Sequence, residues 1–229
     1  MKALILTAIA IMPLSASEPN TLTEAEKQDG FELIFDGKTL EGWRTYKEEK
    51  PKDQWKVEDG AITLTEGGGG DLITKESYKD FELRLEFKIS PEGNSGIMWH
   101  VAEIDGPPYL TGPEFQILDG HGKTGYQTEI QKGNISGAFY DIVPGKIEWS
   151  KPADEWNEAR IRVEGTKITF HINGHKSAEI DTTTDEWKEL LAKSKFATWE
   201  HFNKMETGHI ALQDHSDRVA FRSVRIKKL

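Results

Sequence analysis

Apolar and polar residues alternate along much of this chain with the two-residue period of a β-strand. The clearest run is Phe81–Ile89, where apolar residues occupy every second position and charged residues lie between them. Ile168–Ile172 alternates in the same way and leads into the pair Asn173-Gly174, which is typical of a two-residue hairpin turn because both residues tolerate a positive φ. The pattern predicts strands that turn one face to a core and the other to solvent.

Shorter runs predict further strands and a second hairpin. Asp59-Gly60 is another two-residue turn signal, and it separates two of these runs. In the last run the apolar phase slips between Phe221 and Val224, which indicates a β-bulge. The expected strands are Phe31–Phe35, Trp55–Val57, Ala61–Leu64, Gly96–His100, Glu114–Leu118, Gly137–Tyr140, Ala159–Glu164, Gly208–Gln213 and Val219–Ile226.

Helical signals are few. Thr23 and Glu26 have the spacing of a capping box, so a short helix is expected between them and Gly30. Asp185–Ser194 is the one strong interior helix, because its apolar residues share a face at helical spacing. Many short strands and one inserted helix predict an all-β sandwich or jelly roll. No linker interrupts residues 18–229, which we interpret as a single domain.

The first 17 residues have the features of a secretory signal peptide. Lys2 supplies the positive start, Ala3–Met12 the apolar stretch, and Ser15–Ser17 the small residues of a cleavage region. Pro13 ends the apolar stretch well short of the roughly 20 residues that span a bilayer. We therefore expect a periplasmic or secreted protein with no membrane span after cleavage.

Composition excludes several classes of site. The 229 residues include no cysteine, so disulfides, zinc–thiolate sites, thiol nucleophiles and a lipid-anchoring cysteine are ruled out. The net charge of −10 argues against nucleic acid as a partner, because phosphates demand clustered Lys and Arg. The four glycines at 67–70 lack the Lys-Ser/Thr of a phosphate-binding loop and are interpreted as a flexible loop. No serine-hydrolase elbow or zinc-protease motif is present.

The strand Glu114–Leu118 is unusual because its two faces differ. Glu114 and Gln116 share one face, while Phe115 and Ile117 take the other. A polar strand face suits a sugar site, since hydroxyls need matched donors and acceptors, although an ordinary solvent-exposed face has the same pattern. With Asp119, the spacing matches the two-carboxylate motif of retaining β-glucanases, but Gln116 cannot ionise and Asp119 is shorter than the usual Glu.

Two further segments carry residues suited to sugar chemistry. Trp99 could stack on a pyranose ring, and His100 beside it could exchange a proton near neutral pH. His215 offers the same chemistry near the C-terminus, where Gln213 precedes it. Each histidine alone is more readily explained as a structural residue, and their joint occurrence at expected strand ends is what favours a functional role.

As a set, these segments resemble the 3-keto-disaccharide hydrolase family, over nearly all of residues 18–229. The resemblance implies a concanavalin A-like β-sandwich that acts on glycosides already oxidised at C3 by a partner sugar dehydrogenase. It rests on the segments Phe35–Trp43, Asn94–Ile97, Gly112–Asp119, Gly137–Asp141, Trp156–Glu158, Gly208–His215 and Phe221-Arg222.

The resemblance also implies a chemistry. A C3 ketone acidifies the C2 proton, so a base can remove it, the enediolate can expel the C1 leaving group, and water can then add. Such a site needs a base, an acid and a positive or hydrogen-bonding group at the oxyanion. We expect Glu114 or His100 as the base and His215 as its partner in proton transfer. The expected substrate-binding residues are Trp99, Gln116, Asp119, Tyr140 and Gln213.

Three alternatives stay open at this point. The family admits a divalent metal as Lewis acid, for which His121, Asp119 and Glu114 would be the ligands. A sandwich with a polar face and a tryptophan could equally be a non-catalytic, lectin-like module. A retaining β-glucanase-like enzyme, which would cleave unoxidised glucan, is the third interpretation.

Overall fold

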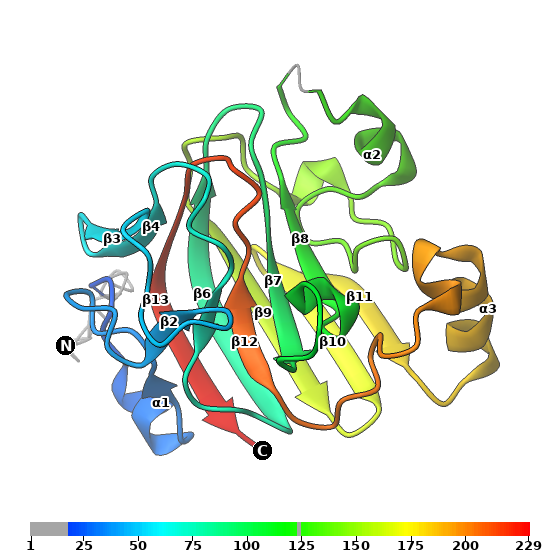
Figure 1. Cartoon of the computed structure of the whole chain (residues 1–229), viewed down its shortest axis with the longest axis horizontal. Helices are drawn as coiled ribbons and strands as arrows, with labels where there is room; N and C mark the ends of the chain where they lie inside the picture. The colour runs from blue at the N-terminus through cyan, green and yellow to red at the C-terminus, as the bar shows by residue number, and fades with distance from the viewer. Residues whose placement is uncertain (1–17, 123–124) are drawn as a thin grey trace, which may run out of the picture.

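Two antiparallel sheets pack face to face in the computed structural model, which describes residues 18–122 and 125–229 (Figure 1). The predicted signal peptide, residues 1–17, lies outside the described residues. The prediction of an all-β sandwich is confirmed. Within the described residues no helix is long and apolar enough to cross a membrane.

The larger sheet has eight strands in the order β11-β10-β9-β6-β13-β4-β3, with β1 paired to β13. Most of the predicted strands belong to it, and the bulge is present as a register shift between Arg222 and Arg225. Its strands are β1 (Glu32–Leu33), β3 (Trp55–Glu58), β4 (Ala61–Leu64), β6 (Phe81–Ile89), β9 (Asn157–Glu164), β10 (Lys167–Ile172), β11 (His175–Asp181) and β13 (Val219–Lys228).

The smaller sheet has five strands in the order β2-β5-β12-β7-β8. Its members are β2 (Trp43–Thr45), β5 (Leu72–Thr74), β7 (Asn94–Val101), β8 (Glu114–Leu118) and β12 (His209–Leu212). Phe115 of this sheet meets Phe87 and Phe170 of the larger one with ring centroids 6.4 and 5.3 Å apart. These edge-to-face contacts are typical of a close-packed core between two sheets.

Both predicted hairpin turns are present. Asp59 and Asn173 have φ of 49° and 47°, and the glycines that follow them also have positive φ. The predicted strand Gly137–Tyr140 is not a regular strand: it forms single β-bridges at Phe139 only. Its backbone leaves the extended conformation at both ends, since Gly137 has a φ of 90° and Asp141 a φ of 57°.

The helices lie around the sandwich, with α1 and α3 at opposite sides of Figure 1. The predicted interior helix is confirmed as α3 (Asp185–Lys193), which Thr184 caps. The prediction of a single inserted helix is wrong, because α2 (Gln127–Lys132) is a second one. It has six residues and no side-chain cap, so neither periodicity nor a capping motif marks it. The short 3₁₀ helices are η1 (Pro108–Leu110), η2 (Ile147–Trp149) and η3 (Lys195–Thr198).

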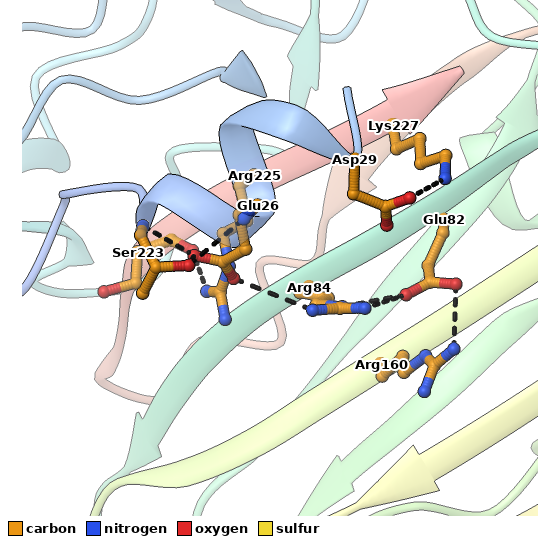
Figure 2. Close-up of polar contacts among 9 residues, drawn as sticks. Glu26, Asp29, Glu82, Arg84, Arg160, Ser223, Arg225 and Lys227 are labelled. Atoms are coloured by element: carbon orange, nitrogen blue, oxygen red, sulfur yellow. Dashed lines mark hydrogen bonds and ion pairs between the residues drawn. The ribbon is translucent and has the colours of Figure 1, made fainter. Parts of the chain in front are cut away.

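Helix α1 (Glu24–Gln28) is tied to the larger sheet by charge. Its predicted capping box is present, and the Glu26 carboxylate also lies 2.6 Å from Arg225 and 3.7 Å from Arg84 (Figure 2). Arg84 also forms an ion pair with the buried Glu82 at 2.6 Å, and Arg160 binds the same carboxylate at 2.9 Å. A chain of alternating charges therefore joins the N-terminal helix to the outer face of β13, β6 and β9.

Candidate active site

The register of the smaller sheet gathers polar side chains on its outer face. Gln116 of β8 is opposite Gly96 of β7, and Glu114 is opposite Met98. The Gln213 amide donates to the Gly96 carbonyl at 2.9 Å, which places Gln213 beside the same glycine. Side chains directly opposite one another point to the same side of a sheet. The predicted polar face of β8 is thus one part of a larger polar surface.

A pocket with an internal volume of about 140 Å³, open to solvent, lies over this surface. It brings together five of the predicted site residues, namely Glu114, Gln116, Tyr140, Gln213 and His215. Six lining residues were not predicted to act there: Asn94, Tyr109, Gly112, Glu129, Lys195 and Phe196. Asn94 and Gly112 fall within the segments that carry the family resemblance, whereas no sequence pattern marks the other four.

Glu114 is the pocket's buried carboxylic acid, with 8% of its surface exposed. Burial raises its pKa to about 8, with the Lys195 charge opposing this and the Asp71 charge adding to it. No described residue donates a hydrogen bond to its carboxylate. A buried acid without a hydrogen-bond partner is costly, and such perturbed groups concentrate at functional sites.

Gly96 makes the space that Glu114 occupies. A Cβ atom at this position would lie 2.1 Å from Oε1 of Glu114 and 2.8 Å from its Cγ. Atoms of real side chains do not approach so closely, so any larger residue here would displace the carboxylate. The glycine in β7 is therefore a condition for the position of the acid in β8.

Two amides flank the acid. The Gln116 side-chain nitrogen donates to Oδ1 of Asn94 at 2.8 Å, which fixes the orientation of both amides. The Gln213 backbone is held on both sides, since its amide donates to Gly96 and its carbonyl accepts from the Ser95 hydroxyl at 2.8 Å. Amides offer both donors and acceptors, as hydroxyl recognition requires.

Tyr140 comes to the site because its segment runs alongside β8. Its backbone amide donates to the Glu114 carbonyl at 3.1 Å. Burial raises the pKa of its phenol, and the nearby carboxylates of Glu129 and Glu114 raise it further. A hydrogen bond to the Glu129 side chain acts in the same direction, so the phenol stays protonated.

His215 lies at the exposed side of the pocket. Its Nδ1 is 3.2 Å from the Tyr126 hydroxyl, and the two rings meet edge to face. An imidazole at this position can exchange protons with solvent as well as with a ligand. The structure brings His215 and Glu114 to the same pocket.

The structure places Trp99 and His100 elsewhere. Trp99 is fully buried against Phe139 and Phe170, so the prediction that it stacks on a sugar is wrong: the ring has no exposed face. His100 is 5% exposed and its Nε2 lies 2.7 Å from the Lys79 carbonyl. It lines a different pocket, so the structure does not bring it together with Glu114.

Asp119 and His121 organise a loop beyond β8. The Asp119 carboxylate accepts from the amides of Glu92 at 3.0 Å and His121 at 3.1 Å, and His121 Nε2 lies 2.9 Å from the Ser150 carbonyl. These bonds use the groups that were expected to bind hydroxyls or a metal. Among the described residues, no three His, Asp or Glu side chains group as metal ligands. The predicted set of His121, Asp119 and Glu114 does not fit a metal site.

The glycine-rich segment at 67–70 is held in place. The amides of Gly68 and Gly70 donate to one oxygen of Asp214 at 3.0 and 2.9 Å. The Asp214 amide in turn donates to the Asp71 carboxylate at 2.8 Å. Burial raises the pKa of Asp71 to about 7. The segment is therefore part of the frame around β12, and the interpretation as a flexible loop is wrong.

The fold and the pocket together define a β-sandwich protein with a candidate sugar site, and comparison with known sequences makes this specific. The sequence model of the 3-keto-alpha-glucoside-1,2-lyase-like domain matches residues 30–227. The chain belongs to this family, which confirms the predicted resemblance.

Known proteins agree with this assignment. The chain is 34% identical over 244 residues to a 3-keto-disaccharide hydrolase of Bacteroides thetaiotaomicron, covering 94% of this chain and 84% of that protein. The crystal structure of a candidate glycosyl hydrolase from Parabacteroides distasonis matches with a TM-score of 0.83 at 30% identity, over 93% of this chain and 100% of that one. A Bacillus subtilis protein with a galectin-like fold has a TM-score of 0.54 at 13% identity, over 82% and 90% of the two chains, and shows the fold alone.

Proposed function

We propose that this protein hydrolyses 3-keto-glycosides by removing the C2 proton, eliminating the C1 substituent and adding water. The observation that carries the proposal is Glu114, a largely buried acid that faces the pocket and accepts no hydrogen bond from the described residues. Its raised pKa makes the carboxylate a stronger base than an exposed glutamate, which suits removal of a proton from carbon. Family membership and the relative's name point to the same substrate class.

In the first step the Glu114 carboxylate takes the C2 proton. The C–H electron pair moves into the C2–C3 bond, and the ketone oxygen takes up negative charge. In the second step this charge returns to form the C3 ketone again, a double bond forms between C1 and C2, and the bond from C1 to the leaving oxygen breaks. His215 protonates that oxygen as it leaves. Water then adds its hydroxyl group at C1 while C2 regains a proton, which gives the 3-keto-sugar.

The remaining pocket residues bind and orient the substrate. Gln116 and Gln213 lie beside Glu114 on the sheet face, where their amides can bind ring hydroxyls. Tyr140 supplies a phenol that stays protonated beside Glu129. Fixing the sugar with its C2 hydrogen toward Glu114 supplies the orientation that proton abstraction needs.

The proposal extends to the context of the enzyme. A C3 ketone on a glycoside must come from an oxidation, so a sugar C3-dehydrogenase is the proposed partner in the reaction sequence. Export to the periplasm or beyond, directed by residues 1–17, is proposed on the sequence pattern alone.

Incubation with a 3-keto-glucoside and with its unoxidised counterpart tests the reaction. We expect release of the aglycone from the keto compound only, and incorporation of deuterium at C2 of the product in D₂O. Glu114→Gln should retain binding and lose turnover by about 1,000-fold or more, since it removes the base. Glu148→Gln, an exposed control outside the pocket, should behave as wild type.

Other outcomes distinguish the alternative functions. A lectin-like module would bind unmodified glucan and release nothing from either substrate. A retaining glucanase would cleave the unoxidised glycoside and leave the C2 hydrogen in place. Undiminished product release by Glu114→Gln would remove Glu114 from any essential proton transfer.

A further inference from the structure

The pocket has a single positively charged lysine or arginine among its described lining residues, and it is Lys195. Lys195 is the first residue of η3, directly after α3. Its backbone amide donates to Oδ2 of Asp141 at 2.7 Å, and the Ser194 hydroxyl before it accepts from the Phe196 amide at 3.1 Å. The backbone from which this side chain extends is therefore held at two points.

Aromatic rings hold the end of the side chain. The Lys195 Nζ lies 4.2 Å from the ring centre of Tyr140, 5.1 Å from that of Phe196 and 5.7 Å from that of Trp199. Ring faces attract a cation, but they do not use its N–H donors as a carboxylate would. Within the described part of the chain, Nζ forms no ion pair and no hydrogen bond. The ammonium thus has donors available for a ligand.

Lys195 and the proposed base Glu114 each shift the pKa of the other. Partial burial lowers the pKa of its ammonium, and Lys132 adds to this, whereas the carboxylates of Glu114, Asp141 and Glu129 act in the opposite direction. In return, the Lys195 charge lowers the pKa of Glu114, against the effects of burial and of Asp71. The two groups face the same pocket without forming a direct ion pair.

We propose that Lys195 is a further catalytic residue, whose ammonium donates a hydrogen bond to the C3 oxygen of the substrate as that oxygen becomes negative. This inference rests on the proposed function, and it supplies the positive group that removal of the C2 proton requires. No proton leaves the lysine: the C2–H electron pair is accommodated on the C3 oxygen, and the ammonium stabilises that charge until the C1–O bond breaks. A donor fixed in a partly dry site is most effective where charge develops.

The inference also gives the lysine a role in specificity. A glycoside with a C3 hydroxyl develops no negative charge at this oxygen, so the ammonium gains nothing from it in the transition state. Discrimination between oxidised and unoxidised sugars would then appear in kcat more than in KM, as expected for an interaction made only in the transition state.

Three variants test the role of Lys195 with a 3-keto-glucoside as substrate. Lys195→Met keeps the length of the side chain and removes the charge, and we expect kcat to fall by about 100- to 1,000-fold with little change in KM. Lys195→Arg keeps the charge and should recover part of this loss. Lys193→Met removes an exposed charge from α3, outside the pocket, and should match wild type.

The pH profile supplies a readout that a merely structural lysine would not change. Loss of the positive charge removes an interaction that lowers the pKa of Glu114, so the rising limb of kcat/KM should move to higher pH in Lys195→Met and stay in place in Lys193→Met. Circular dichroism melting of each variant checks that the fold is retained.

The results separate this inference from the proposed function. If wild type does not act on the keto substrate, the proposed function fails and the inference falls with it. If wild type is active and Lys195→Met keeps kcat within threefold with an unmoved rising limb, the inference alone is overturned. A comparable loss in Lys195→Met and Lys195→Arg, with both proteins folded and the limb unmoved, would also overturn it, because shape and not charge would then matter.

Discussion

Gly96→Ala should move the Glu114 carboxylate without replacing it, so it tests whether activity depends on the position of this group. The added methyl would lie 2.1 Å from Oε1, whereas ordinary van der Waals contact begins near 3.4 Å. The carboxylate oxygen must therefore move by about 1.3 Å. The methyl would also lie 2.7 Å from Cδ and 2.8 Å from Cγ, so the whole Glu114 side chain must rotate. Because the side chain faces an open pocket, we expect this rotation to relieve the clash without opening the sheet.

The cost should fall on activity more than on stability. A displacement of about 1 Å at a reacting group can lower the rate by about 100-fold, so we expect a fall in kcat of this size on a 3-keto-glucoside. Overpacking costs about 1–3 kcal/mol in a dense core, and the open pocket should keep the cost at the lower end of that range.

Steady-state kinetics and thermal melting measure both effects. Gly120→Ala is the matched control, since its methyl would meet the flexible end of Ile147 at 3.1 Å, away from Glu114. If Gly96→Ala retains kcat within threefold of wild type, the reasoning that Glu114 must occupy this place is refuted. A protein that no longer folds would show instead that the carboxylate cannot move.

Two further predictions concern charge. The wild-type kcat/KM should rise with pH to a midpoint near 8, because the pKa of Glu114 is raised to about 8 and the base must be ionised; a midpoint of 4 to 5 in the pH–rate profile would contradict this. Burial would raise the pKa of Glu82, but Arg160 and Arg84 lower it, so its stabilisation is present above the unfolded pKa of about 4.3 and is lost as pH falls through the folded pKa. Denaturant melts of Glu82→Gln should show a free energy of unfolding about 2–3 kcal/mol lower than that of wild type at pH 7, and the difference should shrink toward acid pH. Glu164→Gln, the exposed control, should lose little. A loss in Glu82→Gln that is equal at all pH values would contradict the assignment.

The strands could be predicted where one face is buried and the other is not. Phe81–Ile89 alternates because β6 has the core on one side and charged residues on the other. Strand β7 is buried on both faces, so its sequence lacks the alternation of apolar and polar residues that would indicate which side chains face a ligand. The prediction for Trp99 was wrong for this reason. Trp99 points to the same face of β7 as Ile97, which lies opposite the core residue Phe115.

Alternation along the sequence predicts the part of the site that a strand supplies. Glu114 and Gln116 follow from alternation, and pairing with neighbouring strands then brings Gln213 to them. His100 lies near in sequence, but its φ of 52° interrupts the extended backbone of β7 where the pairing with β12 shifts register. Lys195 reaches the pocket from a 3₁₀ turn after a helix, and tertiary packing alone decides where such a turn lies.

The state of Glu114 bears on the choice between a binding module and an enzyme. Burying a carboxylic acid without a hydrogen-bond partner costs several kcal/mol relative to a well-packed neutral residue. Recognition of hydroxyls does not need this acid, because an amide such as Gln116, in the same strand, supplies both donors and acceptors without a charge. Proton removal from carbon does need it, since an amide cannot accept the proton. The acid lies beside two suitable amides and faces the Lys195 ammonium, which has no ion pair among the described residues; this arrangement supports the proposed reaction over the proposal of a binding module.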